Sequence, residues 1–168
     1  MSASAPAELS RVYVRPEIKV IAFVDCCGYS AYTDVHGDAA GVAIYLQMRE
    51  AIEREAAEAG IVVVKWTGDG AMLAADSSTA MLTCLYRTML ALRVSAPLAL
   101  RGGLTVGQVR QVTWDGADYF GAAVNRAARL CGAAAPWQVR ASLSASQLSM
   151  HFTLRAPQST EVSVAGEQ

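Results

Sequence analysis

Residues 61–75 read IVVVKWTGDGAMLAA, which is two apolar runs separated by a turn with two glycines. The first run, residues 61–66, is rich in β-branched residues, and the second, residues 71–75, is small and apolar. Two such runs around a glycine-rich turn are typical of a β-hairpin. We therefore predict two antiparallel strands joined at residues 67–70.

The segments before this hairpin predict a strand and a helix. Residues 19–24 (KVIAFV) form a short continuous apolar run that ends at Asp25, as in a buried strand. Over residues 38–59, apolar side chains recur at helical spacing with charged residues between them. This pattern predicts an amphipathic helix that ends at Gly60.

The segments after the hairpin predict a second helix and a further strand. Leu82, Leu85, Met89 and Leu92 mark a helix that closes before Pro97, and residues 98–106 follow as a strand. The predicted order is β-α-β-β-α-β. In the α+β class this is the ferredoxin-like arrangement, in which four antiparallel strands carry two helices on one face.

The remaining residues predict a C-terminal extension of this core. We expect a strand at 111–114 with a turn at 115–116, a helix over 119–133 and a short strand over 137–141. A serine-capped helix is predicted over 144–150. Residues 1–17 are expected to be a flexible N-terminal segment, and residues 18–168 one domain.

Composition restricts the classes of function. Of the 168 residues, 53% are hydrophobic and 17% charged, which favours an oligomer interface. The formal net charge is -1 with no basic block, so general nucleic-acid binding has no electrostatic support. The four cysteines match no zinc pattern, and no apolar run is long enough to span a bilayer. We expect a cytoplasmic protein with reduced thiols.

Two aspartates are candidate metal ligands. Asp25 ends a predicted strand, and Asp69 lies in the hairpin turn between two glycines. These strands are neighbours in the predicted sheet, so both carboxylates can reach the same edge, where they would suit hard divalent cations. The alternative is that Asp25 caps a loop and Asp69 only makes the turn.

Two further segments are candidate ligand-binding sites. Residues 26–30 (Cys26, Cys27, Gly28, Tyr29 and Ser30) follow Asp25, and their backbone N–H groups are suited to phosphate oxygens. Asn125 and Arg129 are four residues apart, so they share one face of the predicted helix. The alternatives are an ordinary strand-to-helix turn and a solvated polar stripe.

Lys65 interrupts the first apolar run of the hairpin. It is one of two lysines in the chain, and a buried lysine requires a partner. Asp118 is a candidate partner. The pair forms either a core ion pair or part of a ligand-binding site, and Asp118 alternatively belongs only to its loop.

Three segments together resemble the catalytic domain of class III adenylate and guanylate cyclases. They are residues 23–30 (FVDCCGYS), 65–70 (KWTGDG) and 118–129 (DYFGAAVNRAAR). The resemblance covers roughly residues 19–150. It implies an adenylate cyclase, a lyase that converts ATP into 3′,5′-cyclic AMP and pyrophosphate for intracellular signalling, with two divalent metal ions, Mg²⁺ or Mn²⁺.

The resemblance also implies the roles of individual residues. The metal-binding aspartates fall on Asp25 and Asp69, and the adenine-selecting pair falls on Lys65 and Asp118. The ribose-positioning asparagine is Asn125 and the transition-state arginine is Arg129. Arg101, in the segment LRGGLTVG (residues 100–107), falls where the family has an arginine that contacts the terminal phosphates.

In this family two subunits pair head to tail and share each active site. The resemblance therefore implies a homodimer with two equivalent sites. Lysine only donates and ionised aspartate only accepts hydrogen bonds, so the pair Lys65 and Asp118 matches N1 and N6 of adenine rather than guanine.

Two features depart from the family pattern. Cys26 and Cys27 stand where a small aliphatic pair is usual, and no lysine follows Lys65, although the family commonly has a phosphate-binding lysine near the C-terminus. Arg155 is a candidate replacement, but arginine and lysine bind phosphate differently. The alternatives are a nucleotide-binding regulatory module with negligible turnover, a cyclase with another nucleotide preference, and a pure dimerisation domain.

Overall fold

The computed structural model describes residues 13–113, 116–145, 148–155 and 163–165, and the side chains of residues 15–113 and 116–142. In chain order the elements are β1 (Tyr13–Cys26), α1 (Tyr29–His36), α2 (Asp38–Ala59), β2 (Val62–Trp66), β3 (Gly70–Ala75), α3 (Ser78–Ser95), β4 (Leu100–Thr113), β5 (Ala117–Phe120), α4 (Ala122–Ala133), β6 (Gln138–Ala145), β7 (Leu148–Arg155) and β8 (Ser163–Ala165).

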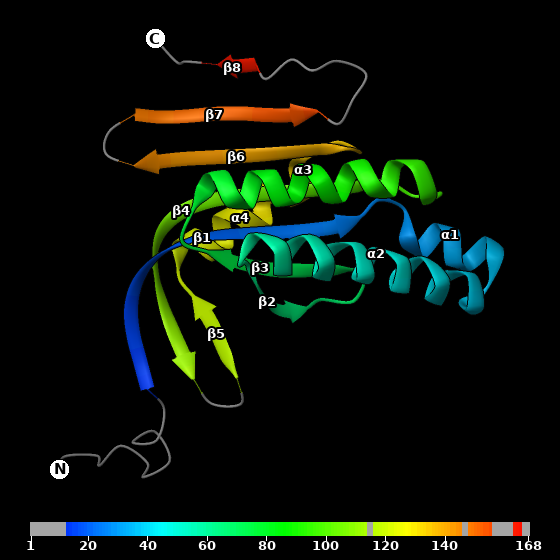
Figure 1. The fold of residues 1–168 in the computed structure, drawn as a ribbon, viewed down its shortest axis with the longest axis horizontal. Coiled ribbons are helices and arrows are strands. Elements are labelled where there is room, and N and C mark those ends of the chain that lie inside the picture. Colours follow the sequence, from blue (N-terminus) through cyan, green and yellow to red (C-terminus); the bar gives the residue numbers. More distant parts are fainter. Residues whose placement is uncertain (1–12, 114–115, 146–147, 156–162, 166–168) are drawn as a thin grey trace, which may run out of the picture.

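The four strands at one end of the sheet have the ferredoxin-like order that the sequence predicts. Four strands lie side by side as β2-β3-β1-β4, and every neighbouring pair among them is antiparallel (Figure 1). The hairpin of β2 and β3 and both long helices, α2 and α3, form where the hydrophobic pattern predicts them. The α+β fold class and its βαββαβ core are confirmed.

The extension beyond this core is a second group of strands. β6 pairs in parallel with the first half of β4, and β7 and β8 continue the sheet antiparallel beyond it. β5 pairs with the second half of β4, so the long strand β4 joins both groups (Figure 1).

The helix predicted over residues 144–150 is wrong. Ser144 belongs to β6, and Leu148 begins β7, which pairs with β6 along its whole length. A short apolar pattern does not separate a helix from a strand, and here the pairing partner decides.

Three further boundaries differ from those predicted. The strands expected at 98–106 and 111–114 are one strand, β4. Residues 119 and 120 belong to β5 rather than to a helix, which begins at Ala122. Residues 13–17, assigned to the flexible segment, pair with β4 as the start of β1. Residues 1–12, residue 114 of the predicted strand and residue 115 of the predicted turn lie outside the described residues.

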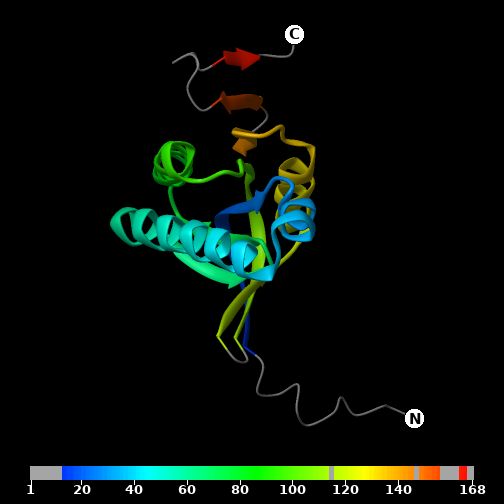
Figure 2. The same ribbon diagram turned by 90° about the vertical axis from the view of Figure 1, so that its right-hand side faces the viewer.

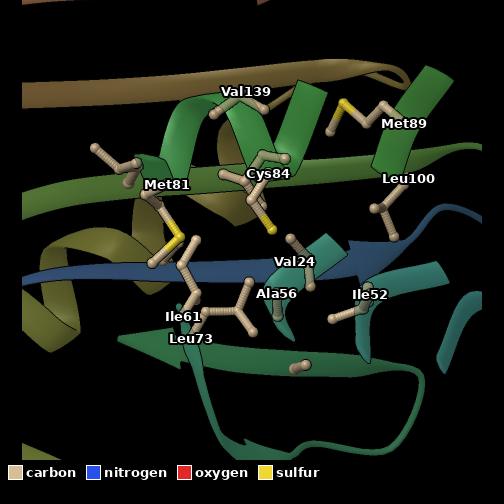
Figure 3. Packing of buried hydrophobic residues seen from close by; sticks show 14 of the residues in the cluster. Val24, Ile52, Ala56, Ile61, Leu73, Met81, Cys84, Met89, Leu100 and Val139 are labelled. Atoms are coloured by element: carbon tan, nitrogen blue, oxygen red, sulfur yellow. The ribbon is translucent and has the colours of Figure 1, made fainter. Parts of the chain in front are cut away.

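Apolar side chains pack on both faces of the sheet. α2 and α3 cover one face, and the larger core cluster lies beneath them, including Ile52, Leu73 and Leu85 (Figures 2 and 3). α4 covers the opposite face over a smaller cluster that contains Ile21, Met72 and Ala127 (Figure 2). Successive residues of β1 alternate between these two faces, as the two-residue period of a strand requires.

All four cysteines are free in the structure. No helix of the described part of the chain is long and apolar enough to cross a membrane.

Candidate active site

Asp25 lies at the end of β1, opposite Arg101 of β4. The two residues are direct partners in the antiparallel register. The Arg101 guanidinium donates two hydrogen bonds to Oδ2 of Asp25, from Nε at 2.8 Å and from Nη2 at 2.6 Å. Its Nη1 donates to the carbonyl oxygen of Gly132 at 3.2 Å. The hydrogen bond to Asp25 raises the pKa of Arg101, which therefore stays charged.

Asp69 lies beside Asp25 because β3 begins directly after the turn. Gly70 pairs with Asp25, and a Cβ at Gly70 would collide with the carbonyl oxygen of Val24, so the turn can approach β1 only with glycine there. Burial and the charge of Asp25 raise the pKa of the Asp69 carboxyl, while its backbone hydrogen bond and Arg101 lower it. The sheet thus brings together the two aspartates that the sequence selects.

The segment after Asp25 has two amides that are already bonded. The backbone N–H of Cys26 donates to the Asp69 carbonyl at 3.2 Å, and that of Cys27 donates to the Ala99 carbonyl at 2.8 Å. Gly28 precedes α1, whose first amides have no partner within the helix. Within the predicted phosphate loop, residues 26–30, a ligand could therefore bind the backbone N–H groups of residues 28–30.

Three thiols surround this edge of the sheet. Burial raises the pKa of Cys26 to about 12 and that of Cys131 to about 12, and it also raises the pKa of Cys27. All three are neutral thiols at pH 7 and do not compete with the carboxylates for a hard cation.

A second polar cluster lies where β2 meets β5. Nζ of Lys65 is 2.6 Å from Oδ2 of Asp118, and it lies 5.8 Å from the ring centroid of Phe120. The expectation that Lys65 is buried is wrong, because its side chain is 42% exposed. The register of β2 shifts at a bulge between Val63 and Lys65, and a bulge of this kind changes the direction of the side chains that follow it.

Asn125 and Arg129 lie on the outer face of α4. Ala123, Ala127 and Cys131 of this helix are buried against the sheet, whereas Asn125 and Arg129 are exposed. On an α-helix, a side chain two residues from a buried one is rotated by about 200° around the axis and so faces the opposite side. These two side chains therefore share one face, as the sequence predicts, and that face is turned away from their own sheet.

The two clusters lie towards opposite ends of α4. Asp118 is in β5, directly before the helix, whereas Arg101 binds Gly132 in its last turn. The twelve residues of α4 rise about 18 Å. The pair Lys65 and Asp118 and the pair Asp25 and Asp69 are thus separate surfaces of one chain.

The carboxylates of Asp25 and Asp69 fit a divalent cation. They offer oxygen ligands, burial and then the charge of Asp25 raise the pKa of Asp69, and a positive group already binds Asp25. Among the described residues, no group of three His, Cys, Asp or Glu side chains could hold a metal ion. Further ligands would therefore come from water or from substrate phosphates, as is usual for Mg²⁺.

Three features of this region were not predicted from the sequence. Phe120 is a large apolar residue that is 53% exposed, and the Gly132 carbonyl binds Arg101. Gly103 lies directly under α4, where a Cβ would collide with the helix backbone. The run Gly102-Gly103 was a signal for such a close approach, whereas nothing in the sequence marks the Gly132 carbonyl. The side chain of Arg155, the candidate for the absent lysine, lies outside the described residues.

Solved structures share this fold at low sequence identity. The adenylyl cyclase CyaB from P. aeruginosa superposes with a TM-score of 0.70 at 18% identity, over 77% of this chain and 79% of that one. The guanylyl cyclase Cya2 gives 0.72 at 14% identity, over 90% and 98%. A bacterial light-regulated adenylyl cyclase gives 0.72 at 21% identity, over 79% of this chain and 45% of that one.

The chain matches no protein-family profile and no curated protein sequence. The structural similarity defines the class of fold: the chain has the fold of adenylyl and guanylyl cyclase catalytic domains.

Proposed function

We propose that this protein is a nucleotidyl cyclase that converts ATP into 3′,5′-cyclic AMP and pyrophosphate. In this reaction the ribose 3′-oxygen forms a bond to the α-phosphorus, the bond from that phosphorus to the pyrophosphate oxygen breaks, and the hydroxyl proton passes to solvent. Divalent cations, when bound, would supply activation of the hydroxyl and neutralisation of phosphate charge.

The side chains of this protein would bind and orient the substrate. Asp25 and Asp69 would hold the cations at the sheet edge, and the free amides of residues 28–30 would bind phosphate oxygens. Asn125 would position the ribose, and Arg129 would stabilise the charge that develops on the α-phosphoryl group.

One observation carries the proposal: the fold brings Asp69 beside Asp25 and, separately, Lys65 beside Asp118. Asp25 and Asp69 form a candidate site for the cations that accompany a triphosphate. Lys65 and Asp118 form a pair of a hydrogen-bond donor and an acceptor, which suits the base. The ammonium donates to N1 of adenine and the carboxylate accepts from N6, so this pair supports ATP over GTP.

We further propose that each site is shared between two copies of the chain. Asn125 and Arg129 point away from the sheet that carries Asp25, and α4 lies between the two clusters. A second copy, placed head to tail, would supply its Asn125 and Arg129, with its Lys65 and Asp118, to the cations of the first.

The test is product analysis with purified protein, ATP or GTP, and Mg²⁺ or Mn²⁺. We expect cyclic AMP from ATP, and a loss of at least about 100-fold in kcat in Asp25→Asn and Asp69→Asn, because each removes a carboxylate that would hold the cations at the reacting phosphate. Cyclic GMP as the main product would contradict the ATP preference and leave the cyclase intact. Nucleotide binding without any cyclic product would identify a regulatory module instead.

The same assay tests the base-reading pair. The double substitution K65E/D118G removes both groups that match adenine, so we expect kcat/KM for ATP to fall by about 10-fold or more. Arg87→Gln in α3 removes an exposed charge outside both clusters and serves as the control. An unchanged preference for ATP in the double variant would refute the assignment of Lys65 and Asp118.

A further inference from the structure

Arg101 occupies Oδ2, one of the two carboxylate oxygens with which Asp25 could bind a cation. Its Nε and Nη2 both donate to Oδ2, at 2.8 Å and 2.6 Å, whereas Oδ1 has no partner among the described residues. Two N–H groups on one oxygen use most of its lone-pair capacity. A divalent cation cannot bind Oδ2 at about 2.0–2.6 Å while the guanidinium stays in place.

The position of Arg101 is set by the fold. Arg101 is the register partner of Asp25 on the neighbouring strand, and its Nη1 is held by the Gly132 carbonyl of α4. The guanidinium is therefore oriented from two sides, by β1 and by the end of α4. The contact between Arg101 and Asp25 is therefore ordered by the fold, unlike an ion pair between flexible side chains on the surface.

The contact is also open to exchange. The side chains of Arg101 and Asp25 are 32% and 29% exposed, so water can solvate either group when they separate. A partly exposed ion pair contributes little net free energy, so a cation of higher charge can displace the guanidinium. A cation on Oδ1, the other oxygen of the same carboxylate, would still lie close to the guanidinium, and two positive groups repel one another at such short distance.

We propose that Arg101 is an internal counter-ion of the metal site, which a divalent cation must displace from Asp25 before it binds. This rests on the proposed function only in assigning a divalent cation to Asp25 and Asp69. In the metal-free protein Arg101 neutralises one of the two carboxylates. When the cation binds, the guanidinium is released and becomes free to bind another anion, such as a phosphate of the proposed substrate.

The consequence is a low affinity for metal alone that rises when Arg101 is removed. Mn²⁺ binding is measured by electron paramagnetic resonance without nucleotide, in wild type, Arg101→Gln, Arg101→Lys, Arg110→Gln and Asp25→Asn. We expect Arg101→Gln to bind Mn²⁺ about fivefold more tightly than wild type, the factor that matches one partly exposed ion pair.

The other variants separate this contact from a general effect of charge. Arg101→Lys keeps the charge but loses the fork of donors, so its affinity should lie between wild type and Arg101→Gln. Arg110→Gln removes the same charge nine residues further along β4, about 30 Å away, and should bind like wild type. Asp25→Asn should abolish the binding.

A second measurement follows Arg101 directly. In the wild type, Mg²⁺ should shift the ¹⁵N–¹H signal of Arg101 Nε, because the hydrogen bond to Asp25 breaks. Equal Mn²⁺ affinity in wild type and Arg101→Gln, or an Nε signal that stays in place at Mg²⁺ concentrations that fill the site, would overturn the proposal.

These results are independent of turnover. Tighter Mn²⁺ binding in Arg101→Gln supports the counter-ion role even if no cyclic nucleotide forms, in which case only the proposed reaction fails. Formation of cyclic AMP with unchanged Mn²⁺ affinity in Arg101→Gln would leave the reaction standing and refute the counter-ion role.

Discussion

At the scale of one residue, the candidate metal ligand Asp69 lowers the stability of the metal-free fold. Burial and the neighbouring Asp25 raise the pKa of its carboxyl above the ordinary value of 3.8. Between the two pKa values the folded protein binds more protons than the unfolded one, so stability falls as pH rises through this window. At neutral pH the ionised carboxylate therefore destabilises the metal-free fold.

Asp69→Asn should accordingly stabilise the metal-free protein at pH 7. We expect the midpoint of thermal unfolding, measured with a chelator present, to rise by about 1–3 °C. The gain should shrink as pH falls through this window and vanish below 3.8, where Asp69 is protonated in both states. Asp25→Asn is the matched control: it loses the ion pair with Arg101 and should lower the midpoint. A lower midpoint for Asp69→Asn at pH 7 would contradict this account.

At the scale of elements, the contact between α4 and β4 positions much of the candidate site. α4 packs directly on Gly103, and its last turn supplies the carbonyl that holds Arg101. A Cβ at Gly103 would collide with the backbone of Ala127 and Cys131, and helix backbone cannot move aside as a side chain can. The absence of one side chain therefore sets the distance between helix and sheet.

Gly103→Ala should force α4 off the sheet. We expect the free energy of unfolding, measured by urea denaturation, to fall by about 1–3 kcal/mol, the usual cost of overpacking a core. Gly132→Ala is the control on the same helix, since nothing lies within 4 Å of its Cβ position and the carbonyl remains. The account is wrong if the two variants are equally stable.

At the scale of the whole molecule, one chain carries the parts of the proposed nucleotide site on two surfaces. Asp25, Asp69 and Arg101 meet at one sheet edge, whereas Lys65 and Asp118 meet where β2 approaches β5. The apolar composition of the chain is in keeping with an interface between copies. Pairing of two chains would unite the two surfaces.

Mixed dimers test this division. An equal mixture of Asp69→Ala and Arg129→Ala chains, each inactive alone, should recover about a quarter of wild-type activity, because half of the dimers then hold one intact site of two. A mixture of Asp25→Ala and Asp69→Ala chains should recover none, since both changes damage the same half of the site. No recovery in verified mixed dimers of the first kind would contradict shared sites.

Much of the fold was predictable because the strongest patterns are local. Residues 38–59 have a clear helical period, and the hairpin has two β-branched or apolar runs around glycines, so both predictions are confirmed. Residues 144–150 have no such distinct period, and pairing with β6 makes them strands. The candidate site residues were selected by motif, and their assigned roles stay predictions.

The sequence alone determined the βαββαβ order and the choice of Asp25 and Asp69, since periodicity and residue type are properties of neighbouring positions. Only the tertiary structure decided that Arg101 binds Asp25 and that Lys65 is exposed beside Asp118. These contacts join residues far apart in the chain, and strand register and the packing of α4 bring them together.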